Sequence, residues 1–221
     1  MTLRREAWRT LAVLLVGLVV VSAVSSGCKA RRTLAQDARG LEDPDFPDER
    51  RAAIASLQRR PEGRVEPYTE RFRQLARVDP HPSVRAQAVR ALNQARDEKA
   101  RPVFVAAAGD ASARVQLEAV KALRHLPDDR ALPRLIELAT NEENDSDVRM
   151  WAVRALSRYP RLDVARVLVN LLQGRDFAVS YEARGSLRRM TGGKDFHYEQ
   201  RLWLAYLTTA SNPFANARPP Q

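Results

Sequence analysis

Three basic residues stand at the same place in three consecutive, similar segments of this sequence. They are Arg90, Lys121 and Arg154, spaced 31 and 33 residues apart. If the segments stack side by side, these side chains form a row that could bind phosphate groups or a carboxylate-rich protein surface. Trp151 lies one helical turn before Arg154, and a partly exposed tryptophan beside arginines is typical of a protein-binding anchor. The alternative for Trp151 is packing under a neighbouring loop. The alternative interpretation of the row is a solvated helix face.

No residue pattern in the sequence points to catalysis or to metal binding. The three histidines, His81, His125 and His197, are far apart and lack the spacing of metal ligands. The sequence contains no Gly-x-Ser-x-Gly segment. The Gly-Gly-Lys segment at 192–194 lacks the first glycine and the final Ser or Thr of a phosphate-binding loop. We therefore expect a non-enzymatic protein with no catalytic residues, no metal, no cofactor and no small-molecule substrate.

The first 28 residues have the layout of an exported protein. Arginines occur up to Arg9, and the uncharged segment Leu11–Val24 is shorter than a membrane-spanning helix. Two serines and a glycine then precede Cys28, the only cysteine. This segment resembles a bacterial lipobox, in which the cysteine is lipidated and becomes the new N-terminus. The resemblance implies a signal peptide at 1–27, a lipidated tether at 28–47, and a membrane-anchored place in the cell envelope, on the periplasmic side or at the cell surface.

Composition favours a helical fold with a sizeable core. The 221 residues include only 9 glycines, and 44% of them are hydrophobic. The formal net charge is +10, from 37 Lys and Arg against 27 Asp and Glu, which suits nucleic acid or an anionic membrane surface. Only four of these basic residues are lysines, and no basic run exceeds two residues. The charge by itself therefore selects no partner.

Self-similarity decides the fold prediction. Segments 84–92, 115–123 and 148–156 share the pattern Val-x-x-x-Ala-Val-(Arg/Lys)-Ala-Leu, and weaker copies occur at 179–187 and 52–57. Their apolar residues recur at the spacing of one face of an amphipathic helix. A second helix is expected after each copy, at 68–77, 98–108, 130–140, 163–173 and 198–209. Each copy is expected to pair with the helix that follows it as a helical hairpin.

The repeated Asp…Val-Arg…Ala-Val-Arg-Ala-Leu pattern resembles the HEAT-like repeats of the short bacterial type. The resemblance implies an all-α fold, an α-solenoid of about five HEAT-like helical hairpins over 48–210, followed by a flexible tail at 211–221. It also implies that Arg85 and Arg149 join acidic residues in a ladder between repeats, which Gln116 interrupts.

Together these features predict a membrane-tethered HEAT-repeat lipoprotein, a scaffold that docks an unidentified envelope protein or peptide. The candidate binding residues are Arg90, Lys121, Trp151 and Arg154, and Cys28 is the lipidation site. Two other functions stay open. One is a nucleic-acid-binding HEAT-like protein that uses the basic row, which export would exclude. The other is a bilin-lyase-like enzyme or chaperone subunit, because short HEAT-like repeats also occur in bilin lyases.

Overall fold

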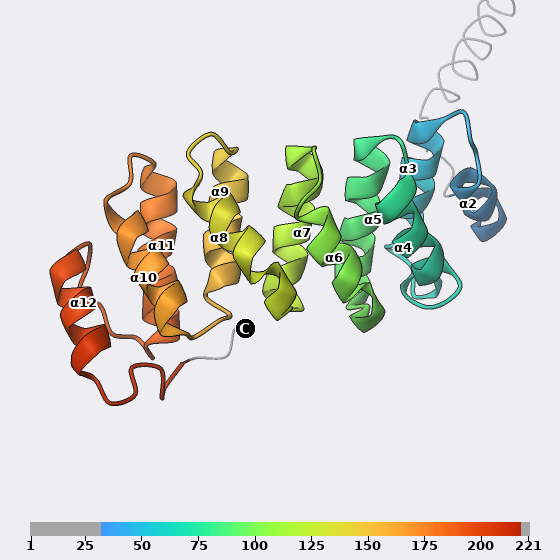
Figure 1. Ribbon diagram of the computed structural model, residues 1–221. Helices are drawn as coiled ribbons and strands as arrows, with labels where there is room; N and C mark the ends of the chain where they lie inside the picture. Colours follow the sequence, from blue (N-terminus) through green and yellow to red (C-terminus); the bar gives the residue numbers. More distant parts are fainter. Residues whose placement is uncertain (1–31, 218–221) are drawn as a thin grey trace, which may run out of the picture. The chain divides into compact units, whose positions relative to one another are not determined.

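The structure, a computed structural model, describes residues 32–217, and this range is folded as helices with no strand (Figure 1). The all-α solenoid predicted from the sequence is confirmed. The α-helices are α2 (Leu34–Leu41), α3 (Pro47–Leu57), α4 (Tyr68–Val78), α5 (Pro82–Ala95), α6 (Arg101–Ala107), α7 (Ala113–His125), α8 (Leu132–Thr140), α9 (Ser146–Leu156), α10 (Leu162–Asn170), α11 (Phe177–Met190) and α12 (Gln200–Thr209). Short 3-10 helices lie at Glu62–Arg64, Glu98–Ala100, Asp129–Ala131 and Leu171–Gln173.

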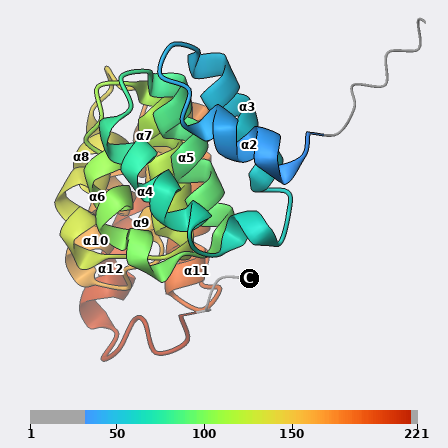
Figure 2. The ribbon, with the colours of Figure 1, turned by 90° about the vertical axis from the view of Figure 1, so that its right-hand side faces the viewer.

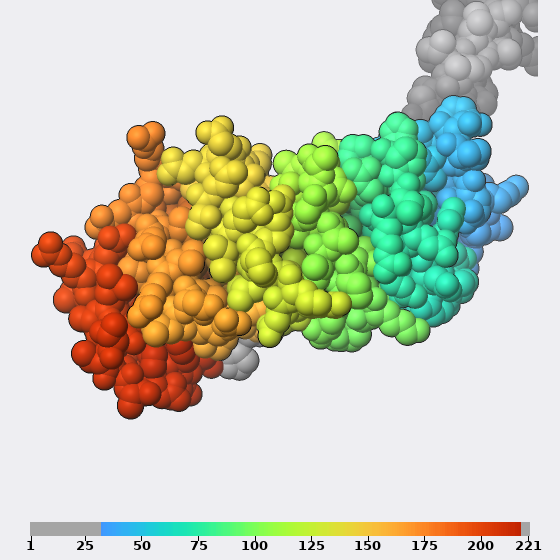
Figure 3. Space-filling model, viewed as in Figure 1, coloured from blue at the N-terminus to red at the C-terminus, as the bar shows by residue number. Residues whose placement is uncertain are grey.

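The helices form five hairpins and a closing helix. Each even-numbered helix from α2 to α10 packs against the odd-numbered helix that follows it, and α12 packs against α10. The sequence predicts that each helix with a repeat copy pairs with the helix after it. In the structure it packs more closely against the helix before it, so this prediction is wrong. The second helices of the hairpins, α3, α5, α7, α9 and α11, contact one another in that order and form a continuous row (Figure 1). Figure 2 views the stack end-on, with α2 and α3 nearest the viewer. Successive hairpins consequently follow one another along the molecule in sequence order (Figure 3).

Capping residues explain where the second helices begin. Asp145 accepts hydrogen bonds from the backbone N–H groups of Asp147 and Val148, and Asp176 does the same at the start of α11. Pro47 and Pro82 open α3 and α5, where a missing N–H group is harmless. These turns hold the second helices in the same register from one repeat to the next.

The repeat pattern fills the core. The leucine that ends each copy is fully buried, and the valine that begins each copy is at most 1% exposed. The alanine in the middle of each copy has no exposed surface either, so neighbouring second helices can approach closely. These positions are Leu92, Leu123, Leu156 and Leu187; Val84, Val115, Val148 and Val179; and Ala88, Ala119, Ala152 and Ala183.

The repeat domain begins earlier than expected. Part of the predicted tether at 28–47 is helix α2, which packs on α3 and belongs to the compact unit that starts at Leu34. The sequence hides this helix because its central residues are mostly polar. Asp37 is nevertheless completely buried and accepts a hydrogen bond of 2.8 Å from the Ser56 hydroxyl.

The described part of the predicted flexible tail is also packed. Phe214 lies partly buried against the core, and the Tyr206 hydroxyl donates to the carbonyl of Pro213 over 3.4 Å. Asn216 lies close to Gly192. A Cβ atom added to Gly192 would be only 2.5 Å from the Cβ atom of Asn216. The chain therefore returns to the turn after α11 before residues 218–221, which lie outside the described range.

Candidate protein-docking surface

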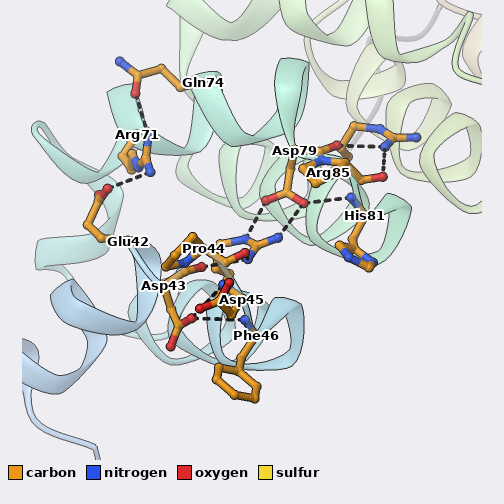
Figure 4. A network of polar contacts seen from close by, with 12 residues as sticks. Glu42, Asp43, Pro44, Asp45, Phe46, Arg71, Gln74, Asp79, His81 and Arg85 are labelled. Atoms are coloured by element: carbon orange, nitrogen blue, oxygen red, sulfur yellow. Dashed lines mark hydrogen bonds and ion pairs between the residues drawn. The ribbon is translucent and has the colours of Figure 1, made fainter.

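An aspartate–arginine ladder aligns the N-terminal ends of the second helices. The Arg50 guanidinium donates to both carboxylate oxygens of Asp79 over 2.7 and 3.1 Å, and both side chains are buried. Figure 4 shows Asp79 with the backbone N–H of His81, which also donates to its carboxylate. Arg85 makes the equivalent pair with Asp110, over 2.8 Å at both oxygens. Each arginine thus binds the aspartate at the start of the next second helix.

The ladder continues beyond the interruption that the sequence predicts. Gln116 donates to the backbone carbonyl of Asp110 instead of reaching a carboxylate. Arg149 resumes the pattern with a looser pair to Asp176, at 3.7 Å. The structural role inferred for Arg85 and Arg149 is therefore confirmed, and these arginines are used for packing.

About one turn further along the second helices, residues of the predicted basic row also form ion pairs with the neighbouring repeat. The Arg90 guanidinium binds the Glu118 carboxylate over 2.7 and 3.1 Å, and Arg154 binds Glu182 over 2.8 Å. The glutamates are nearly buried, while 54% of the Arg90 side chain and 34% of the Arg154 side chain stay exposed. Lys121 also reaches Glu118, over 3.3 Å. The row is thus neither a freely solvated face nor a set of unpaired charges.

Glu118 remains ionised in this setting. Its burial raises the pKa of the carboxyl group, but the hydrogen bond from Arg90 and the charges of Arg90 and Lys121 outweigh burial, so the pKa lies below its ordinary value. The partly exposed arginine therefore has a permanent carboxylate partner. Reversing the charge at Arg90 would leave this buried carboxylate facing a second negative charge.

Trp151 occupies the register position that Glu118 holds one repeat earlier. Its ring lies between two basic residues, with the Lys121 Nζ 5.4 Å and the Arg154 Cζ 4.6 Å from the ring centroid. Both distances suit cation–π attraction, worth about 0.5–1 kcal/mol at exposed sites. The structure therefore brings together Lys121, Trp151 and Arg154, and Arg90 stands one repeat away on the same row.

The sequence analysis missed two neighbouring features of this face. A hollow of about 290 Å³ lies beside Glu182, where Gly185 takes the register position of the basic row and Tyr181 and Arg189 stand at the rim. Arg124 and Arg158 lie near the C-terminal ends of α7 and α9. Their signal in the sequence is weak, because the equivalent positions in the other copies vary in residue type. We call the exposed side of α5, α7, α9 and α11 the basic face.

Other predicted sites stay untested. Cys28 and the predicted signal peptide lie outside the described residues. Within residues 32–217 no helix is long and apolar enough to cross a membrane, and no group of three or more His, Cys, Asp or Glu side chains is placed to hold a metal ion.

Comparison with known families agrees with this geometry. The sequence model for HEAT repeats matches residues 33–111 and 69–157, which together make up more than half of the chain. The chain belongs to the HEAT-repeat family. The match starts at residue 33, so it includes α2. No curated protein matches this HEAT-repeat chain.

Solved structures share the fold of this HEAT-repeat protein. The X-ray structure of YibA from Escherichia coli is similar with a TM-score of 0.61 and 20% identity, over 77% of this chain and 62% of the YibA chain. The match thus spans less than two thirds of YibA. The crystal structure of an engineered protein is similar with a TM-score of 0.56 and 21% identity, over 80% of this chain and 90% of that protein. At these identities the likeness shows the fold alone.

Proposed function

We propose that this HEAT-repeat protein is a non-enzymatic docking scaffold, tethered to a membrane of the bacterial cell envelope by lipid on Cys28. HEAT repeats build helical-repeat scaffolds for protein interaction, because a stack of hairpins offers an extended surface. The tether is supported by the charge and length pattern before Cys28 and by the small residues at 25–27. A partner bound by the repeats would be an envelope protein or peptide.

The observation that carries the docking role is the position of Trp151. Its ring is partly exposed and is held by Lys121 and Arg154 from two adjacent second helices. Tryptophan and arginine dominate the binding energy of protein interfaces, because they combine a large apolar surface with hydrogen-bonding groups. The side chain is therefore prearranged as an anchor for a partner.

The tether is tested by mass spectrometry of the protein purified from its own membranes. The expected N-terminal residue is Cys28 carrying acyl chains, and Cys28→Ser should release the protein from the membrane fraction. An unmodified chain that still begins at Met1 would contradict the tether.

The docking role is tested by crosslinking in cells that express the protein. Trp151→Ala should abolish or weaken a specific crosslinked product by at least about thirtyfold, as expected for a central anchor. Leu202→Ala is the matched control, because Leu202 is 52% exposed on the closing helix α12, away from the basic face. Equal crosslinking by the wild type, Trp151→Ala and Leu202→Ala would contradict docking at Trp151.

A further inference from the structure

Three arginines lie at the C-terminal ends of neighbouring second helices, and one of them, Arg124, contacts His125, with 3.4 Å between its Nη1 and the imidazole Nε2. Arg96 follows α5, Arg124 lies in the last turn of α7, and Arg158 follows α9. Burial lowers the pKa of the His125 imidazole, and the charges of Arg96, Arg124 and Arg158 lower it further. These charges therefore favour the neutral imidazole. We call Arg96, Arg124 and Arg158 the arginine cluster.

The arginine cluster lacks the acidic partners that other arginines on the second helices have. Within residues 32–217, no carboxylate lies within ion-pair distance of Arg96, Arg124 or Arg158. In contrast, every other buried or half-buried arginine on α5, α9 and α11 pairs with a carboxylate, namely Arg85, Arg149, Arg154, Arg184 and Arg189.

Helix dipoles explain only part of this arrangement. A cation near a helix C-terminus is stabilised by the partial negative charge there, which suits one arginine on each helix. The cluster charges, however, also repel one another. Burial lowers the pKa of Arg158 and the Arg124 charge adds to the effect. Burial and the charges of Arg189, Arg154 and Arg96 lower the pKa of Arg124, and the charge of Glu182 offsets only part of this. A bound anion would relieve this repulsion.

We propose that the arginine cluster binds the carboxylates of an acidic peptide segment in the protein partner. This inference rests on the docking function proposed above and names the chemistry of the partner. Packed helices lie about 8–10 Å apart, and an extended peptide advances about 3.3 Å per residue. Acidic side chains two or three residues apart can therefore reach successive arginines of the cluster, beside the Trp151 anchor.

A peptide fits this face better than a nucleic acid does. Glu118 and Glu182 are buried within the basic face, next to Lys121 and Arg154. A continuous phosphate backbone would be repelled by these carboxylates, whereas a peptide can place neutral residues over them. The paired arginines of the same helices already bind carboxylates with two hydrogen bonds, as Arg90 does at Glu118, so the geometry suits this ligand.

The test is a binding titration with the full chain purified in detergent. The probe is a fluorescein-labelled octaglutamate peptide, with an octaglutamine peptide as the uncharged control, and fluorescence anisotropy reports binding. Arg124→Gln combined with Arg158→Gln removes two cluster charges. The matched control removes Arg77 and Arg166 in the same way, because both are exposed on the first helices α4 and α10.

The cluster variant should bind octaglutamate at least about tenfold more weakly, as charged hydrogen bonds are lost. The control variant should bind within about twofold of the wild type, and octaglutamine should not bind. In nuclear magnetic resonance spectra, octaglutamate should raise the pKa of His125 in the wild type, since it neutralises the neighbouring charges. Thermal unfolding should show that the cluster variant is at least as stable as the wild type.

Several results would overturn the proposal. Equal losses in the cluster and control variants would show attraction to net charge alone. Cluster-dependent binding that is tighter for an oligothymidine strand, or for phosphatidylglycerol vesicles, would identify a nucleic acid or an anionic membrane as the ligand. Failure of octaglutamate to bind would refute the acidic partner while leaving a Trp151-dependent crosslink intact. Binding of octaglutamate without that crosslink would instead contradict the docking function in the cell.

Discussion

Replacing Asp79 by asparagine should strongly destabilise the N-terminal repeats, because it leaves a buried arginine without its counter-charge. The Arg50 and Asp79 side chains are only 6% and 2% exposed. Asp79 accepts two hydrogen bonds from Arg50 and a third from the backbone N–H of His81, at 2.9 Å. Asparagine keeps the size of the side chain and one acceptor oxygen. The substitution therefore removes the charge and one acceptor without changing the size of the side chain.

The expected loss in the free energy of unfolding is about 3 kcal/mol. Breaking a buried ion pair by neutralising one partner costs about 3–5 kcal/mol, and the lower value applies because the asparagine oxygen still accepts one hydrogen bond. Arg50 also donates to the carbonyls of Asp43 and Pro44, so its charge stays partly solvated by the backbone. Urea unfolding followed by far-ultraviolet circular dichroism measures the loss.

The matched control is Asp48→Asn. Asp48 pairs with Arg51 over 3.1 Å on the same helix, but its side chain is 86% exposed, so the loss should stay below about 0.5 kcal/mol. Replacing Arg50 and Asp79 together should cost less than the sum of the two single losses. Additive losses, or a loss for Asp79→Asn below about 1 kcal/mol, would refute the ladder as a stabilising contact between repeats.

Three further outcomes are expected from urea unfolding. Leu156→Ala should cost about 2–5 kcal/mol, because its side chain is fully buried; a loss below about 0.5 kcal/mol would show that the repeat face is misassigned. Gly63→Ala should cost about 1–3 kcal/mol, because the added Cβ would overlap the backbone of Leu57; unchanged stability would contradict this packing. The hydrogen bond from Arg184 holds the pKa of Asp195 at about 2, below its ordinary value. The stability from this pair is complete above about pH 4 and is lost as the pH falls toward 2, so Asp195→Asn should be less sensitive to acid in that range than the wild type.

The start of the repeat domain illustrates where sequence patterns stop being informative. The copies at 84–92, 115–123 and 148–156 predict their helices well, because apolar residues at helical spacing are repeated. Helix α2 shows no such repetition, and the sequence predicts that its Asp37 lies on the surface. The tertiary structure shows that this polar side chain lies inside, where it contacts the Ser56 hydroxyl and Arg60.

The candidate site was predicted in part. Equal register along the repeats placed Arg90, Lys121 and Arg154 on one face, with Trp151 beside them, and the structure brings these side chains together. The same register does not predict that Glu118 and Glu182 are buried and bind these basic side chains. Nor does it distinguish the unpaired Arg124, because its surroundings come from three different helices.

The sequence by itself determined the all-α class, the repeat length, the buried leucines and the face on which the basic row lies, because helical periodicity is a local property of the chain. Only the tertiary structure decided which charge meets which partner. The side chain at the basic-row position of one second helix reaches the residue that lies three positions earlier in the pattern of the next second helix. Arg90 therefore meets Glu118, while Lys121 meets Trp151. That offset depends on how adjacent helices stagger when their alanine and leucine faces pack, and packing joins residues about 30 positions apart.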